Sequence, residues 1–206
     1  MISQNTEITA FFTGHRYLKE EDHRIIPVRI CDAVEKAYEA GYRRFYCGCA
    51  LGFDTLAAVQ VLRLRESHPD LKLCLAIPCA NQSEHWKEED RDIYRMILEQ
   101  ADEKNILSPV YYKGAMLTRN RFMADRSSLC ICYMNHYQGG TAYTVRYALL
   151  SGRINIINLA MNSFVSTEQL REDKWNYTYI SHSVKKNARI VHLYHMSTRK
   201  LTMKNT

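Results

Sequence analysis

The sequence lacks any run of about 18 consecutive apolar residues, the length that a membrane-spanning helix requires. Its first residues, MISQNTEITAFF, lack the basic and then apolar order of a signal peptide. The sequence also contains no low-complexity linker and no internal repeat. We therefore expect a cytoplasmic protein without a membrane segment, and the 46% hydrophobic content is sufficient for a sizeable core.

Cysteine occurs seven times, an odd number that does not suggest a disulfide framework. Cys74, Cys130 and Cys132 lie in apolar, strand-like runs, where a reduced thiol packs as a small hydrophobic group. The pairs Cys47/Cys49 and Cys130/Cys132 have i, i+2 spacing, which places both thiols on one face of a strand and would allow a four-thiolate metal site. Zinc knuckles usually leave two residues between their thiols, so we expect no metal site.

Positive charge is scarce outside the end of the chain. The net charge is +6, and the residues from Phe164 onward contain eight Lys or Arg and three acids, which leaves +1 for the rest. We therefore do not expect the main body to be a nucleic-acid-binding protein. The basic end is either a solvated tail or a segment that contacts RNA, DNA or an acidic partner.

Short β-favouring runs alternate with segments of helical periodicity along the chain. Strands are expected at residues 7–12, 43–47, 71–77, 105–110, 129–133 and 154–159, and helices at residues 27–40, 55–65, 83–102, 117–125 and 141–150. This order predicts the α/β class, with a doubly wound, mostly parallel sheet of about six or seven strands flanked by helices. We expect residues 1–163 to form this domain. Residues 164–206 form a basic C-terminal extension, in which 177–180 and 189–194 would add edge strands.

Polar and glycine-bearing segments follow four of the predicted strands. They are Thr13-Gly14-His15-Arg16, Gly48 to Asp54, Pro78 to Gln82, and Gln138-Gly139-Gly140-Thr141. In an open parallel sheet a ligand binds beyond the carboxyl ends of the strands, where such segments converge. Glycine, hydroxyl, imidazole and guanidinium groups at this edge predict an anionic, nucleotide-like ligand.

The glycines have two interpretations. Gly48 and Gly52, like Gly139 and Gly140, would let backbone amides approach a phosphate at the start of a helix, where the helix dipole favours negative charge. Alternatively, they allow a tight strand-to-helix turn with close packing. The spacing matches neither GxGxxG nor GxxxxGK[ST]. Thr141 would donate its hydroxyl and amide to a phosphate, or cap its helix.

Four other side chains near these turns are candidates for ligand contact. Asp54 would accept hydrogen bonds from ribose hydroxyls, or act as a helix cap. Arg16 and Arg119 would clamp phosphate, or form surface salt bridges. His15 would act as an acid, a base or a hydrogen-bond donor, or cap the turn.

A second group of candidates lies on predicted helices. Gln82 and Trp86 have i, i+4 spacing and share one face if the helix begins by Gln82. Trp86 would then stack on a base, although a tryptophan at the head of an apolar stripe often belongs to the core. Asn120 and Asp125, on or beside a short helix, would meet the same cleft or serve as surface and capping residues.

The motifs TGHR, GCALGFD, IPCANQSEHW, RNRFMAD and GGTAYTVRYA together resemble the YpsA-like family of the SLOG superfamily, from Ile8 to Leu159. These Rossmann-like proteins also include the DNA-processing protein DprA and the LOG hydrolases. The resemblance implies a nucleotide or nucleotide-derived ligand at the cleft formed by Gly48 to Asp54 and Gly139 to Thr141, beside Thr13 to Arg16. It implies no required cofactor apart from such a ligand.

The chain departs from this pattern at two positions. The family's loop after its second strand usually begins with two glycines, whereas this chain has Gly48-Cys49. The LOG motif resembles GGxGTxxE, and counting seven residues from Gly139 reaches Arg146 in place of the glutamate. Because a cation cannot replace a catalytic carboxylate, LOG-like hydrolysis is disfavoured unless Asp54 or Asp125 substitutes.

Two hypotheses about function follow. In the first, the protein is a sensor or regulatory domain that binds a nucleotide derivative and passes the signal on through a second copy of itself or another protein. In the second, it is a hydrolase or transferase that acts on a nucleoside phosphate. Asp54, Asp125 and His15 are then the catalytic candidates, with Arg16 or Arg119 as the phosphate clamp.

Overall fold

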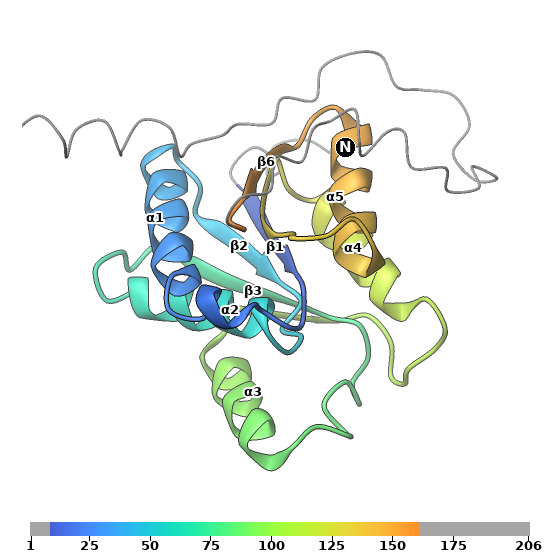
Figure 1. Ribbon diagram of the computed structural model, residues 1–206. Helices are drawn as coiled ribbons and strands as arrows, with labels where there is room; N and C mark the ends of the chain where they lie inside the picture. Colours follow the sequence, from blue (N-terminus) through green and yellow to red (C-terminus); the bar gives the residue numbers. More distant parts are fainter. Residues whose placement is uncertain (1–8, 161–206) are drawn as a thin grey trace, which may run out of the picture.

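The computed structural model describes residues 9–160, which form one sheet with helices on both faces (Figure 1). The predicted basic extension, including its candidate strands at 177–180 and 189–194, lies outside the described residues. None of the helices within residues 9–160 has both the length and the apolar character needed to cross a bilayer.

The elements alternate along the chain as the hydrophobic pattern predicts. The strands are β1 (Thr9–Gly14), β2 (Arg44–Cys47), β3 (Lys72–Ile77), β4 (Glu103–Ile106), β5 (Leu129–Tyr133) and β6 (Asn155–Asn158). The helices are α1 (Ile26–Glu39), α2 (Phe53–Leu64), α3 (Glu88–Gln100), α4 (Ala115–Asp125) and α5 (Gly139–Ser151), with a 3-10 turn η1 (Glu20–Asp22) before α1.

The sheet is parallel throughout, with the strand order β4-β3-β2-β1-β5-β6. The predicted Rossmann-like, doubly wound α/β fold is therefore confirmed. The order reverses beside β1, because β2, β3 and β4 extend to one side of it and β5 and β6 to the other. In open α/β sheets, ligands bind beyond the carboxyl ends of the two strands that flank such a reversal, which is called the switch point and here lies between β1 and β5.

Two apolar cores hold the helices to the sheet. On β1, Phe12 packs in the core formed with α1, α2 and α3, and the neighbouring Phe11 packs in the core formed with α4 and α5. Successive residues of a strand point to opposite faces, so one apolar strand contributes to both cores. Full burial of each phenylalanine stabilises the fold by roughly 1.5–3 kcal/mol.

Two elements differ from their predicted positions. The weak strand predicted at 105–110 is found at Glu103–Ile106. The helix predicted from residue 83 begins only at Glu88, after Lys87 in an extended conformation (ψ 156°). Glu88, Glu89 and Asp90 fill the first turn of α3, where the helix dipole stabilises acidic side chains, so the acids mark the true start of the helix.

Candidate functional site

The segments after β1, β2, β3 and β5 lie at the same edge of the sheet, because all strands run in one direction. The backbone N–H of Phe53 donates to the carbonyl of His15 (3.4 Å), which joins the segments after β2 and β1. Nε2 of Gln82 donates to the carbonyl of Cys49 (2.9 Å), which joins the segments after β3 and β2. The structure therefore brings together Thr13 to Arg16, Gly48 to Asp54 and Gln82, as the sequence indicates.

Gly48 is surrounded by protein atoms. A Cβ at this position would lie 1.1 Å from Nη1 of Arg119 and 2.8 Å from Oδ2 of Asp54. Arg119 on α4 reaches across the Gly48 backbone and donates to Asp54 at the start of α2 (3.2 Å), and both side chains are buried. Glycine is required here because a guanidinium group takes the space of a side chain. The close-packing interpretation therefore accounts for Gly48.

The buried ion pair joins the side chains of Asp54 and Arg119 to each other. Burial raises the pKa of Asp54, and the nearby Arg119 and a long hydrogen bond from the Ala50 amide (3.5 Å) offset this effect only in part. Removing one partner of such a pair would leave an uncompensated buried charge. Arg119, a predicted phosphate clamp, thus holds a carboxylate of its own chain, and Asp54 is already occupied by Arg119.

The backbone of the loop after β2 is conformationally demanding. Gly52 has φ +85°, and a Cβ there would lie 2.0 Å from the carbonyl oxygen of Arg16, so this glycine also serves close packing. Cys49 has φ +51°, a left-handed conformation that glycine adopts without strain. This explains physically why a second glycine at position 49 suits the loop of the family that the chain resembles.

The start of α5 is different, because it is open. No heavy atom of residues 9–160 outside the neighbouring backbone lies within 4 Å of a Cβ placed on Gly139 or Gly140, and both glycines are exposed. Gln138 precedes the helix in an extended conformation and makes no capping hydrogen bond with its side chain. The first amides of α5, with Thr141 buried beside them, thus remain available to an anion.

His15 lies at the switch point and is 9% exposed. Its ring stacks on that of His136, with centroids 3.7 Å apart and an interplanar angle of 16°. Burial is the main cause that lowers the pKa of His15 to about 4, and the nearby His136 is the second. A hydrogen bond between the His15 ring and the backbone of His136 acts in the opposite direction. Nε2 of His15 has no hydrogen-bond partner in the part of the chain that the structure describes.

His136 is a candidate that the sequence did not reveal. It lies on the loop between β5 and α5, and its Nδ1 accepts a hydrogen bond from the Gln138 amide (3.4 Å). The only available signal was its place just before the two glycines of α5. Contact with His15 depends on the pairing of β1 with β5, which local sequence does not specify.

Asp125 and Asn120 have different positions relative to the carboxyl edge of the sheet. Asp125 ends α4 just before β5 begins, at the opposite edge of the sheet, and a strand of five residues separates the edges by about 16 Å. Its carboxylate accepts a hydrogen bond from the Tyr147 hydroxyl (2.7 Å). Nδ2 of Asn120 donates to Oγ1 of Thr144 (2.6 Å) and ties α4 to α5 inside the protein. The catalytic candidate Asp125 therefore lies far from the carboxyl edge of the sheet, whereas ligand contact by Asn120 stays a prediction.

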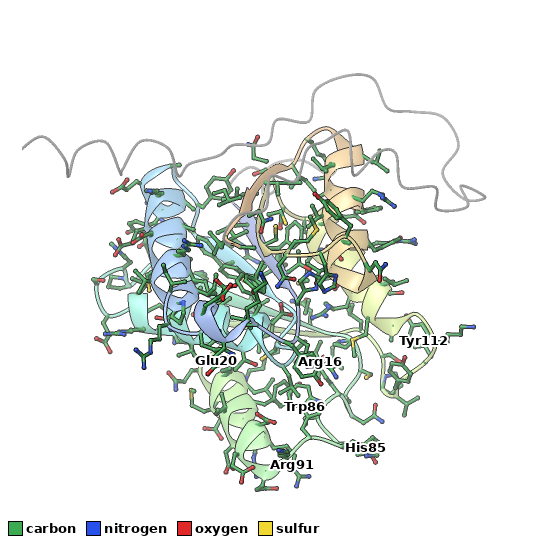
Figure 2. The ribbon with its side chains drawn as sticks, in the orientation of Figure 1. Arg16, Glu20, His85, Trp86, Arg91 and Tyr112 are labelled. Carbon is green, nitrogen blue, oxygen red and sulfur yellow. The ribbon has the colours of Figure 1, made fainter. Side chains whose placement is uncertain are left out.

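Gln82 and Trp86 precede α3, which begins at Glu88, so the condition for a shared helix face is not met. Gln82 is buried against the loop after β2. Trp86 is half-buried and packs edge-on against Tyr94 of α3, with ring centroids 5.2 Å apart, as the core interpretation indicates. Figure 2 shows Arg16 and Trp86 below the sheet in this view, with Tyr112 on the loop before α4. Arg16 is exposed at this edge.

The structure excludes the four-thiolate metal site. Cys47 and Cys49 belong to the core on the α1 and α2 face, whereas Cys130 and Cys132 belong to the core on the opposite face. Within residues 9–160, no group of three or more His, Cys, Asp or Glu side chains is placed to hold a metal ion.

A surface cavity of about 240 Å³ lies at the start of α3, lined by Ser83, Glu88, Arg91 and Arg95. Glu88 forms ion pairs with both arginines, and all three side chains are substantially exposed. Exposed ion pairs of this kind are common on helix surfaces and contribute little to stability. This cavity therefore has a simpler explanation than a ligand site.

The sequence matches the family model described as the YspA SLOG family (YpsA) over residues 11–161. A UPF0398 protein of Bacillus cereus strain B4264 is 28% identical over 167 residues, which cover 79% of this chain and 86% of the relative. A UPF0398 protein of Bacillus thuringiensis strain Al Hakam is 30% identical over 130 residues, which cover 61% of this chain and 71% of the relative.

The fold is similar to two solved structures of DNA processing protein A (DprA). The protein from Streptococcus pneumoniae has a TM-score of 0.53 and 18% identity, and the match covers 75% of this chain and 52% of DprA, so the chain spans about half the length of that protein. The protein from Helicobacter pylori, whose structure concerns its single-stranded DNA binding mode, also has a TM-score of 0.53 and 18% identity, covering 81% of this chain and 73% of DprA. Similarity at this level of identity establishes the fold.

Proposed function

Since the chain belongs to the YspA SLOG family, we propose that it binds a nucleotide or nucleotide-derived ligand at the carboxyl edge of the sheet, as a sensor or regulatory domain. The ligand lies in the crevice between β1 and β5. Its phosphate accepts hydrogen bonds from the first amides of α5, at Gly139, Gly140 and Thr141.

The observation that carries this proposal is the open, uncapped start of α5 at the switch point of the sheet. Protein atoms fill the space beside Gly48 and Gly52, so the proposed phosphate site consists of the backbone at Gly139 and Gly140. The exposed guanidinium group of Arg16 follows β1 at the same edge and supplies a positive charge for the ligand.

The geometry favours binding over hydrolysis. Asp54 is held by Arg119, and Asp125 lies at the other edge of the sheet, so neither carboxylate is placed as a general acid or base for a ligand in the crevice. Of the three catalytic candidates, His15 alone remains beside the proposed phosphate site.

A charge placed at Gly140 tests the site. We expect Gly140→Glu to weaken nucleotide binding at least tenfold, because a carboxylate would occupy the phosphate position, while the fold is retained since the added side chain meets open space. Calorimetry against NAD, ADP-ribose, cyclic nucleotides and nucleoside monophosphates measures the affinity.

Gly140→Gln is the matched control, because it adds a side chain of the same size without charge. A difference between the two variants reports the electrostatic contribution. If the folded wild-type protein binds no member of the panel, or if Gly140→Glu binds as tightly as Gly140→Gln, the phosphate site is wrong.

Single-stranded DNA is the second candidate ligand, and the similarity to DprA favours it. The DprA structure from Helicobacter pylori concerns single-stranded DNA binding, and the sugar-phosphate backbone would present the same anionic group to α5. The small net charge of residues 1–163 is weak support for tight binding of a long strand. We therefore place the nucleotide first.

A further inference from the structure

The stacked imidazoles of His15 and His136 adjoin the start of α5 but have no role in the site so far. We infer that His15 is a proton-linked part of the anion site: it takes up one proton from solvent when a phosphate-bearing ligand binds at α5, and donates Nε2–H to that ligand. This inference rests on the proposed function and adds a binding residue and a pH dependence to it.

The position of His15 provides the geometry. Its ring stacks on that of His136. Nδ1 of His136 accepts a hydrogen bond from the backbone amide of Gln138, the residue that precedes the first turn of α5. Through His136, His15 thus contacts the loop that leads to the open amides of Gly139 and Gly140.

The hydrogen bonding of His15 identifies the free nitrogen. Nε2 is a buried nitrogen without a hydrogen-bond partner among residues 9–160, and His15 is only 9% exposed. A buried polar atom left unsatisfied destabilises the protein, and a hydrogen bond to a ligand would offset this cost. As a neutral ring with its proton on the other nitrogen, His15 offers a lone pair at Nε2, and a phosphate would repel this lone pair unless a proton were added.

In the absence of a ligand, the groups around His15 leave its imidazole neutral, because its pKa is about 4. The nearby titratable and charged groups are Arg16 on its own loop, Asp22 through the Tyr133 hydroxyl, Tyr133 itself, His136, and the pair formed by Asp54 and Arg119. Burial is the main cause that keeps the imidazole neutral, and the nearby His136 is the second. An anion at α5 would change that balance.

The linkage has a definite sign. Without ligand, the pKa of His15 is about 4. A phosphate beside the ring would raise this pKa, because a nearby opposite charge favours the protonated imidazole. Protonation then occurs on binding, and the affinity is expected to be on the order of tenfold higher at about pH 6 than at about pH 8.

The test uses ADP-ribose, because its pyrophosphate, esterified at both ends, keeps a constant charge over this pH range, with sulfate as a second constant-charge probe. Calorimetry in two buffers with different ionisation enthalpies measures the protons taken up on binding. We expect uptake approaching one proton for the wild type at about pH 6, and none for His15→Gln. His136→Phe is the matched variant: it retains a ring over His15 and should retain proton uptake.

The outcomes separate the inference from the proposed function. If neither probe binds at either pH, the proposed function fails and the inference fails with it. Binding without proton uptake overturns the inference alone and indicates an ordered water at Nε2. Proton uptake that survives His15→Gln but is lost in His136→Phe would show that His136, and not His15, takes up the proton, and would overturn the inference. If His15→Gln does not fold, NMR titration of the His15 ring in the wild type must show its pKa rising with ligand.

Discussion

Gly48 and Gly140 occupy similar strand-to-helix turns in the sequence but have different surroundings in the structure. A Cβ on Gly48 would overlap the guanidinium group of Arg119, whereas a Cβ on Gly140 would meet open space. The buried pair that Gly48 accommodates joins α2 on one face of the sheet to α4 on the other. One glycine therefore serves stability, and the other is available for binding.

This contrast yields a stability prediction for Gly48→Ala. The added methyl group would displace Arg119 and leave Asp54 buried without its partner, so we expect a loss of roughly 3–5 kcal/mol in the free energy of unfolding. Urea unfolding measures the change, with Arg119→Met as the reference for breaking the pair from its other side. A Gly48→Ala variant within about 0.5 kcal/mol of wild type would show that Arg119 can be accommodated elsewhere.

His15 gives the free protein a defined acid sensitivity. Its folded-state pKa of about 4 is below the usual value of 6.5, so the unfolded state binds more protons between these values. Its contribution to stability is therefore present above pH 6.5 and is lost as the pH falls toward about 4. We expect His15→Gln to unfold with a shallower pH dependence in this window, measured by urea unfolding at a series of pH values. Parallel curves would contradict the assignment.

At the scale of the element, the two ends of α5 show how glycine position determines its effect. Gly140 lies in the first turn with ordinary backbone angles, whereas Gly152 ends the helix with φ +69°. Gly140 is a residue of low helix propensity inside a helix, whereas Gly152 adopts a left-handed conformation that other residues adopt only with strain.

Alanine substitutions at the two ends of α5 should have opposite effects. We expect Gly140→Ala to be neutral or to stabilise the protein by up to about 1 kcal/mol, and Gly152→Ala to destabilise it by about 1–2 kcal/mol. Thermal unfolding followed by circular dichroism compares the variants. Equal effects at both ends would mean that the helix frays before the protein unfolds.

At the scale of the whole molecule, positive charge belongs mainly to the end of the chain. Of the net charge of +6, +5 belongs to the residues from Phe164 onward. We propose that any affinity for DNA comes mainly from this basic extension, while the crevice binds the nucleotide.

The triple variant Lys185→Gln, Lys186→Gln, Arg189→Gln in the full chain tests this division. We expect the wild type to bind an oligo-dT strand weakly, with affinity that falls steeply as salt rises, and the variant to lose most of that affinity. Fluorescence anisotropy over a salt series measures it, and ADP-ribose binding serves as the control that should not change. DNA binding that survives the triple variant but is lost in Gly140→Glu would place the strand in the crevice.

The predictions from sequence succeeded where the physical signal is local. Alternation of apolar runs with helical periodicity predicted the order of strands and helices and the doubly wound sheet, because periodicity reflects which face each residue buries. It also placed the segments after β1, β2 and β5 at one edge, since parallel strands share their direction. The start of α3 was missed because the apolar stripe extends back to Trp86, although the acids at 88–90 mark the first turn.

The tertiary structure alone decided which side chains meet. Arg119 fills the space beside Gly48, His136 stacks on His15, and Asp125 lies at the far edge of the sheet, and none of these facts follows from spacing along the chain. Each depends on which strands pair and in what order, because Arg119 lies 71 positions after Gly48 and His136 lies 121 positions after His15. Local sequence determines what each segment becomes, whereas contacts between distant segments form only when the apolar faces of all of them are buried together.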